Sequence, residues 1–232
     1  MNFDLPLNRK EKHWSACCLP HIICGDNMEH LSSFLELVGV PEKFLKKSYG
    51  IGELDFYAEY SLKDSCRDWD LKVSGMIPDI IILIKNGSDT FLIVLECKFF
   101  GRESAKRIRK QLDAQKAIAR GIMEKLGIDE NNFIHTLIAL ELPDGFTQGE
   151  KEVILRWEDI LKKYKCKEKT YFYEQLKIAS SRTELISREV DSFCPYATGK
   201  WTWKKIVAYY KSVGNFFVGR KGGINQLEAD CS

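Results

Sequence analysis

Two apolar runs separated by a short polar turn lie in the middle of the chain. They span residues 77–84 and 91–100 and are rich in isoleucine, valine and phenylalanine. Continuous runs of this length are typical of strands covered on both faces, although periodicity alone does not exclude a buried helix. The turn between them contains Asn86-Gly87, a strong hairpin signal. We therefore predict a β-hairpin within the core of the fold.

Other periodic segments flank the hairpin on both sides. They predict a helix capped by Asn27 and ending near Val38, a strand within 53–62, a helix over 103–126 and a strand over 133–142. Further along, a capping box at Thr147–Glu150 predicts a helix running to Tyr164, and two more helices are expected within 169–190 and 202–214. On the 103–126 helix, Gln115 falls on the same stripe as the aliphatic residues.

The order of these elements is helix, three strands, helix, strand, helix, which predicts an α/β fold with a mixed sheet of four to five strands flanked by helices. No linker rich in proline, glycine or serine interrupts the chain. We expect a single domain over 1–232, with a core at about 28–142. A segment rich in cysteine and histidine (1–27) precedes the core, and a helical tail rich in aromatic and basic residues (about 166–232) follows it.

Composition narrows the class of protein. With 44% hydrophobic and 29% charged residues the chain is typical of a globular protein, and its net charge of +2 gives weak support for a polyanionic partner. No apolar run approaches the ~20 residues that cross a bilayer, and the N-terminus lacks the pattern of a signal peptide. Eight cysteines are too sparse and irregular for a disulfide scaffold. We expect a cytoplasmic protein without membrane contact.

Ionisable residues interrupt the two apolar runs of the hairpin. If its loop has four residues (86–89), Asp79 lies directly opposite Glu96; if the loop has two, Asp79 faces Val94 and is diagonal to Glu96. Lys98 lies two residues beyond Glu96 and therefore shares its face. Either register places two carboxylates and one ammonium on one patch of sheet.

Such a cluster has a chemical use. Buried charges without partners cost several kcal/mol each, and neighbouring carboxylates repel unless a cation lies between them. A few hard oxygen ligands with open positions for water and phosphate suit Mg²⁺, with Mn²⁺ as an alternative. A nearby lysine can hold the attacking water and stabilise developing negative charge. These groups together indicate metal-assisted hydrolysis of a phosphodiester.

Pro78-Asp79, sixteen intervening residues and Glu96-Cys97-Lys98 resemble the signature of the PD-(D/E)XK phosphodiesterase superfamily. The resemblance covers about residues 28–142 and implies a restriction-endonuclease-like core. It implies that Asp79, Glu96 and the backbone carbonyl of Cys97 bind Mg²⁺, and that Lys98 assists the nucleophilic water.

Many members of this superfamily carry a further acidic residue before the motif strands. Four residues compete for that role here: Glu29, Glu36, Glu53 and Glu59. We favour Glu36, followed by Glu59. Some branches also carry Gln-x-x-x-Tyr on the following helix. This chain has Gln111 and Gln115 at those positions, and Gln111 is our candidate for contact with the active site.

The start of the same helix is basic. Its candidate nucleic-acid-binding residues are Arg102, Lys106, Arg109 and Lys110, close to the strand end that presents Glu96 and Lys98. The alternative is a merely solvated helix face, and for the motif itself the alternative is a salt bridge at a solvated strand end.

Three further groups have two interpretations each. Cys17, Cys18, His21 and Cys24 could bind zinc or could pack. We predict His135 to be a core histidine rather than a ligand or base. The aromatic and basic residues of 201–211 could stack on nucleic acid or form one face of an amphipathic helix.

The sequence thus predicts a Mg²⁺-dependent nuclease acting on DNA, in defence, restriction or repair, with a homodimer as a plausible assembly. The alternative is a catalytically silent nuclease fold that serves as a nucleic-acid-binding or assembly subunit. A third, less favoured hypothesis is a zinc-linked regulatory module.

Overall fold

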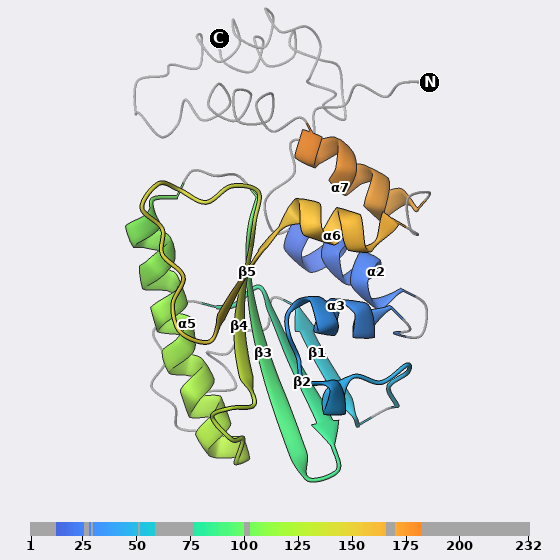
Figure 1. Ribbon diagram of the computed structural model, residues 1–232, viewed down its shortest axis with the longest axis vertical. Coiled ribbons are helices and arrows are strands. Elements are labelled where there is room, and N and C mark those ends of the chain that lie inside the picture. The colour runs from blue at the N-terminus through green and yellow to red at the C-terminus, as the bar shows by residue number, and fades with distance from the viewer. Residues whose placement is uncertain are drawn as a thin grey trace, which may run out of the picture. The chain divides into compact units, whose positions relative to one another are not determined.

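The computed structural model describes residues 13–25, 28, 30–50, 52–58, 77–99, 103–165 and 170–181. Five predictions fall outside these residues: the Asn27 cap, Glu29, Glu59, Arg102 and the tail beyond 181. The described part of the chain forms an α/β structure in which helices flank a five-stranded mixed sheet (Figure 1), as the sequence predicts.

The sheet has its strands in chain order. They are β1 (Leu54–Ala58), β2 (Ile80–Asn86), β3 (Asp89–Lys98), β4 (Phe133–Ala139) and β5 (Glu152–Arg156). The first three strands are antiparallel neighbours, whereas β3 to β4 and β4 to β5 are parallel pairs. A parallel pair needs a crossover connection, and helix α5 (Ala105–Leu126) supplies the one between β3 and β4.

The β2–β3 hairpin fixes the register of the motif residues. Lys85 pairs with Thr90, and the tight turn between the strands contains Gly87 in the left-handed region, with φ of 63°. Continuing this register by one residue beyond the Ile80–Leu95 pair places Asp79 directly opposite Glu96. The register of the four-residue-loop alternative is therefore the one observed.

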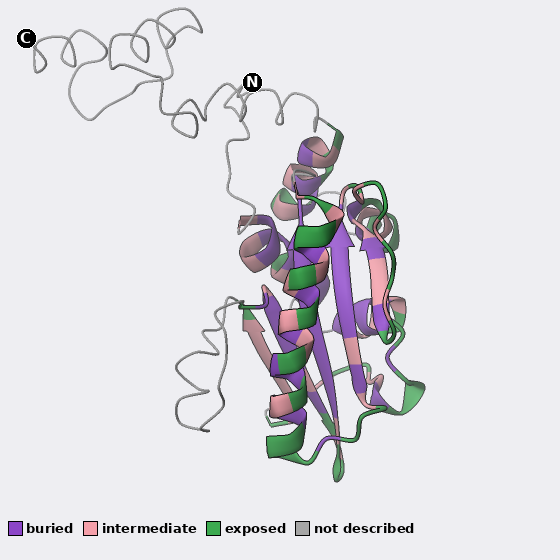
Figure 2. Cartoon of the chain, turned by 90° about the vertical axis from the view of Figure 1, so that its left-hand side faces the viewer, coloured by how far each residue is buried: buried purple, intermediate pink, exposed green. Residues whose placement is uncertain are grey.

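Helix α5 covers one face of the sheet. The Ser104 side chain accepts a hydrogen bond from the backbone N–H of Arg107 at the helix start, and Gly127, with φ of 66°, ends the helix. Its buried residues include Ile118, Ala119, Ile122 and Met123, which pack on Ile81, Leu92 and Val94 of the hairpin. Figure 2 shows exposed residues along the outward side of α5.

The opposite face is covered by several short helices (Figure 1). They are the π-helical turn η1 (Trp14–Cys18), α2 (Leu19–Cys24), α3 (Leu31–Leu37) and α6 (Trp157–Lys163). Helix α7 (Tyr171–Ser181) packs on η1, α2 and α6, and the 3-10 turn η3 (Glu42–Phe44) packs on β2. Phe99 stacks on Trp14 at 4.7 Å between ring centroids and meets Trp157 edge-on at 5.5 Å. The Trp157 indole donates a hydrogen bond to the Lys98 carbonyl at 3.1 Å. Aromatic packing therefore supports the end of β3 from behind.

The single helix predicted from the capping box at 147–150 is wrong. Residues 152–156 form β5, which pairs with β4, and α6 begins only at Trp157. Lys151 has φ of 55°, which no helix continues through, and the Arg156 N–H donates to the Asp159 carboxylate where α6 begins. The helical spacing of residues 157–164 is real, but it does not extend backward through the strand.

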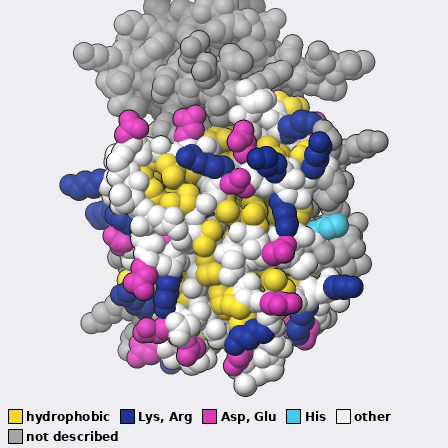
Figure 3. Space-filling view, viewed as in Figure 1, with side chains coloured by type: hydrophobic (Ala, Val, Ile, Leu, Met, Phe, Trp, Pro, Cys, Tyr) yellow, Lys and Arg dark blue, Asp and Glu magenta, His cyan; other side chains and the backbone are white. Residues whose placement is uncertain are grey.

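Charged side chains of both signs are intermixed on the face shown in Figure 3. Within the ranges described, none of the helices combines the length and the apolar character needed to cross a bilayer.

Candidate active site

Glu96 is a buried carboxylate held by three donors. Its side chain lies on β3 facing α5, and the residue is 2% exposed. Lys98 Nζ lies 2.7 Å from Oε1, Gln111 Nε2 donates to the same oxygen at 2.5 Å, and Gln115 Nε2 donates to Oε2 at 2.6 Å. Glu96 and Lys98 are two residues apart on a strand and therefore share a face of the sheet. Gln111 and Gln115 are four residues apart on a helix and therefore share a face of α5. The predicted partner Gln111 is thus in contact with Glu96.

Asp79 lies immediately before β2 and is half-buried. Its Oδ2 accepts a hydrogen bond from the backbone N–H of Cys97 at 2.7 Å, at the point where the two strands stop pairing. Residues directly opposite on antiparallel strands have Cβ atoms roughly 4.5–5.5 Å apart. The hairpin therefore brings Asp79, Glu96 and Lys98 to one patch, as predicted from their spacing.

Glu103 is a third carboxylate at this patch, and the sequence analysis missed it. Its Oε2 lies 3.5 Å from Lys98 Nζ and is buried without a hydrogen bond to any described residue. Its other oxygen faces Arg107, whose side chain is 75% exposed. The sequence feature that could have identified Glu103 is its position directly before Ser104, where the chain passes from the motif strand into α5.

The donor set fits the magnesium ion that the motif implies. Carboxylate oxygens and a backbone carbonyl are hard ligands of the kind that Mg²⁺ accepts. Glu96 and Glu103 share the buried Lys98 ammonium and Asp79 lies on the same patch, so the patch gathers carboxylates of the kind that a divalent cation would bridge. In the ranges described, no three His, Cys, Asp or Glu side chains form a metal-binding group. Water and phosphate oxygens would have to complete the coordination, as is usual for Mg²⁺.

Of the other acidic candidates, the structure describes Glu36 and Glu53, and neither contacts this patch. Glu36, on α3, pairs with Lys163 of α6 at 2.7 Å, and this hydrogen bond lowers the pKa of Glu36. Glu53 pairs with Lys46 at 2.5 Å and accepts the Gly50 N–H at 2.9 Å. Helix α3 covers the face of the sheet opposite α5 (Figure 1), so Glu36 lies on the other side from Glu96.

The basic residues of α5 divide into two kinds. Lys106 and Lys110 are exposed, and neither makes a hydrogen bond or ion pair with a described residue. Arg109 instead pairs with both oxygens of Glu152 and lies 3.2 Å from Asp113. Two of the four predicted phosphate-binding residues are thus available at the surface, and a third is committed to a carboxylate.

Glu152 forms a second buried cluster at the start of β5. Besides Arg109, it binds Lys116 Nζ at 2.8 Å and accepts the Gly149 N–H at 2.6 Å. Burial favours the protonated carboxyl, but the hydrogen bonds from Arg109, Lys116 and Gly149 prevail and lower the pKa of Glu152 to about 2. A buried carboxylate with two cationic partners carries no charge that a further ion would need to balance.

His135 is fully buried on β4, as predicted for a core histidine. Its Nε2 lies 2.9 Å from Oε1 of Gln115, the residue whose amide nitrogen donates to Glu96. Burial lowers the pKa of His135 to about 4. The sequence analysis did not assign Gln115 to the site, although a polar residue on an apolar stripe was the signal.

The N-terminal cysteine and histidine residues mainly pack. The His21 ring stacks on Phe172 with centroids 4.2 Å apart, and Cys18 Sγ lies 3.3 Å from His13 Nε2. Burial raises the pKa of Cys24 to about 11, which disfavours the thiolate that zinc requires. These contacts give no support to the zinc hypothesis.

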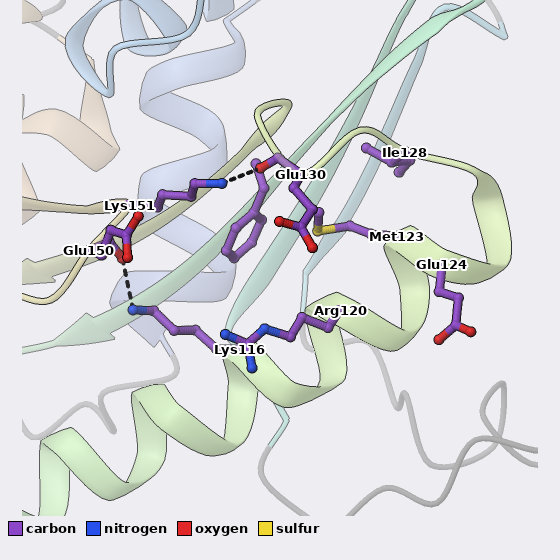
Figure 4. Close-up of a pocket in the computed structure, with 9 residues that line it drawn as sticks. Lys116, Arg120, Met123, Glu124, Ile128, Glu130, Glu150 and Lys151 are labelled. Atoms are coloured by element: carbon purple, nitrogen blue, oxygen red, sulfur yellow. Dashed lines mark hydrogen bonds between the residues drawn. The ribbon is translucent and has the colours of Figure 1, made fainter.

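A cavity of about 500 Å³ lies beside the C-terminal half of α5 (Figure 4). Its lining residues are Lys116, Arg120, Met123, Glu124, Ile128, Glu130, Phe133, Glu150 and Lys151. Its two lysines, Lys116 and Lys151, donate to the backbone carbonyls of Glu150 and Glu130, at 2.9 and 2.7 Å respectively. Three cationic and three carboxylate side chains line the cavity, so its charge singles out no class of ligand.

Comparisons of the chain with protein-family models, with curated proteins and with solved structures gave no match. The functional conclusion is therefore drawn from the residues and their geometry.

Proposed function

We propose that the protein is a Mg²⁺-dependent nuclease that hydrolyses phosphodiester bonds in DNA. The observation that carries the proposal is the buried Glu96–Lys98 pair with Asp79 placed opposite by the hairpin register. The five-stranded mixed sheet flanked by helices agrees with the restriction-endonuclease-like core that the motif resemblance implies.

Each residue of the patch has a distinct role. Asp79, Glu96 and the Cys97 carbonyl would hold the ion, which when bound supplies a Lewis acid for the phosphate and an acidified water. Lys98 lies between Glu96 and Glu103, where its ammonium can orient a water and stabilise negative charge developing on the phosphate.

Substrate binding would use the exposed start of α5. Lys106 and Lys110 are exposed in the first turns of α5, the helix that follows the strand carrying Lys98. Exposed ammonium groups are suited to contact with a phosphate backbone.

One observation favours the alternative of a silent nucleic-acid-binding or assembly subunit. Glu96 already has an ammonium and two amide donors, so the cluster is well satisfied without a metal ion. Such a subunit would bind nucleic acid without cutting it under any divalent ion.

The test is a panel of labelled linear and circular DNA and RNA, incubated with Mg²⁺, Mn²⁺ or a chelator. Wild type should cut DNA only with a divalent ion. Asp79→Asn can still accept the Cys97 N–H, so it should keep the fold while losing activity by at least about 10²–10³-fold, as should Lys98→Met.

Glu36→Gln is the matched control, because it removes an exposed carboxylate that pairs only with Lys163 among described residues. Its cleavage rate should equal that of wild type. Wild-type protein that shifts DNA in a gel but cuts nothing with any divalent ion would establish the silent subunit instead. Equal loss of activity in Glu36→Gln and Asp79→Asn would contradict the assigned site.

A further inference from the structure

Gln115 and His135 are polar residues in apolar surroundings. Gln115 lies on the buried stripe of α5 and His135 on the facing side of β4, and both are 0% exposed. Buried polar groups persist in proteins when they are hydrogen-bonded. Here they bond to each other, and Gln115 also bonds to Glu96.

The direction of these hydrogen bonds follows from Glu96. An ionised carboxylate only accepts, so Gln115 must present its NH₂ group to Oε2. The amide oxygen then faces His135, and the His135 Nε2 must carry the proton. The other neutral tautomer would favour the flipped amide, with its oxygen against the carboxylate.

We propose that His135, as its Nε2–H tautomer, fixes the Gln115 amide and thereby positions Glu96 for metal binding. The inference rests on the proposed function, since it assigns two positioning residues to the same site. Gln111 and Lys98 hold one oxygen of Glu96, and the Gln115–His135 pair holds the other.

Two features of His135 support a role as a donor. Its Nδ1 is buried and has no hydrogen-bond partner among the described residues, so packing alone gains nothing from a ring nitrogen there. Burial, the largest influence, and the nearby Lys116 and Arg109 lower its pKa, against the opposing charge of Glu152. The ring is therefore neutral near pH 7 and has a single proton to place.

A matched pair of substitutions separates the two ring nitrogens. The Gln side chain can place its NH₂ where Nε2 lies, whereas the Asn side chain reaches only as far as Nδ1. Mn²⁺ binding to the full chain, measured by titration calorimetry without nucleic acid, is the readout. His135→Asn and Gln115→Met should weaken binding on the order of 10–100-fold, and His135→Gln should retain most of it.

His135→Asn and Gln115→Met should lower kcat strongly, and His135→Gln should lower it little. All three should leave KM nearly unchanged, because the lysines proposed to contact DNA are untouched. Equal losses in His135→Gln and His135→Asn, or no loss in either, would overturn the proposal.

Long-range ¹H–¹⁵N NMR of the wild-type protein tests the relay without metal or substrate. The expected result is a proton on Nε2 and none on Nδ1. The Nδ1–H tautomer would refute the relay even if the protein cuts DNA. Conversely, the Nε2–H tautomer in a protein that neither binds Mn²⁺ nor cuts would leave the hydrogen-bond geometry intact and refute the proposed function, and with it the positioning role.

Discussion

Two buried carboxylates lie under the same helix, and their partners differ. Glu152 has the guanidinium of Arg109, the ammonium of Lys116 and a backbone N–H. Glu96 has one ammonium, which also faces Glu103, and two neutral amides. A further carboxylate, Asp79, lies immediately before the neighbouring strand β2, opposite Glu96 when the hairpin register is continued by one residue.

The comparison separates a carboxylate with two cationic partners from the carboxylate of the proposed active site. At Glu152 one carboxylate has two cationic partners and a backbone N–H donor, so the cluster is complete and ties α5 to the start of β5. At Glu96 two of the three donors are neutral amides and Lys98 is shared with Glu103, so this cluster has less cationic neutralisation than the one at Glu152. Charge balance distinguishes the two sites where burial does not, since both residues are at most 5% exposed.

Neutralising Glu152 should mainly reduce stability, whereas neutralising Glu96 should mainly reduce cleavage activity. Glu152→Gln leaves Arg109 and Lys116 without their anion and should reduce the free energy of unfolding by about 3–5 kcal/mol. Glu96→Gln also breaks an ion pair, but it leaves Lys98 with Glu103 and relieves repulsion with Asp79, so it should cost less stability than Glu152→Gln while abolishing cleavage. Urea denaturation and the DNA cleavage assay measure the two properties. A Glu96→Gln protein as destabilised as Glu152→Gln would remove the distinction.

Acid should destabilise the protein in two steps. His135 has a folded-state pKa lowered from 6.5 to about 4, so its contribution is full above pH 6.5 and is lost as the pH falls toward 4. Glu152, lowered from 4.5 to about 2, contributes fully above pH 4.5, and this stability is lost as the pH falls toward 2.

Each step corresponds to about 3 kcal/mol. Denaturation curves collected from pH 7 to 2 should show both losses. His135→Gln should flatten the first step and Glu152→Gln the second. A first step that is unchanged in His135→Gln would show that another group titrates there.

Substitutions of the basic residues of α5 should differ in how they change the salt dependence of DNA affinity. Lys106→Ala and Lys110→Ala should each reduce the slope of log affinity for duplex DNA against log salt by about 0.9, because each removes one phosphate contact. Their thermal stability should match wild type. Arg109→Ala should instead lower stability and change the slope less, because Arg109 binds Glu152. Fluorescence anisotropy at several salt concentrations provides the measurement.

Local sequence pattern predicted the elements whose signals are complete within one segment. The hairpin follows from two apolar runs and a glycine turn, and its register follows from the side-chain period of two. The α5 helix has both a capping serine and a terminal glycine. Asp79, Glu96 and Lys98 could be placed together because adjacent strands of one hairpin carry them all.

What sequence did not predict depends on contacts between distant segments. β5 is a five-residue strand whose pairing with β4 is invisible locally, and its apolar residues run directly into the helical pattern of α6. The sequence analysis did not single out the buried Glu152, because its partners Arg109 and Lys116 lie more than thirty residues earlier. Gln115 and His135 were each noticed on an apolar face, but only the packing of α5 on β4 shows that they meet.

The indole N–H of Trp157 donates a hydrogen bond to the backbone carbonyl of Lys98, directly behind the proposed reaction centre. Any shift of that peptide when an ion or a nucleic acid binds would alter the environment of a fluorophore that touches the opposite side of the strand. Intrinsic tryptophan emission therefore offers a label-free optical report of occupancy at the site.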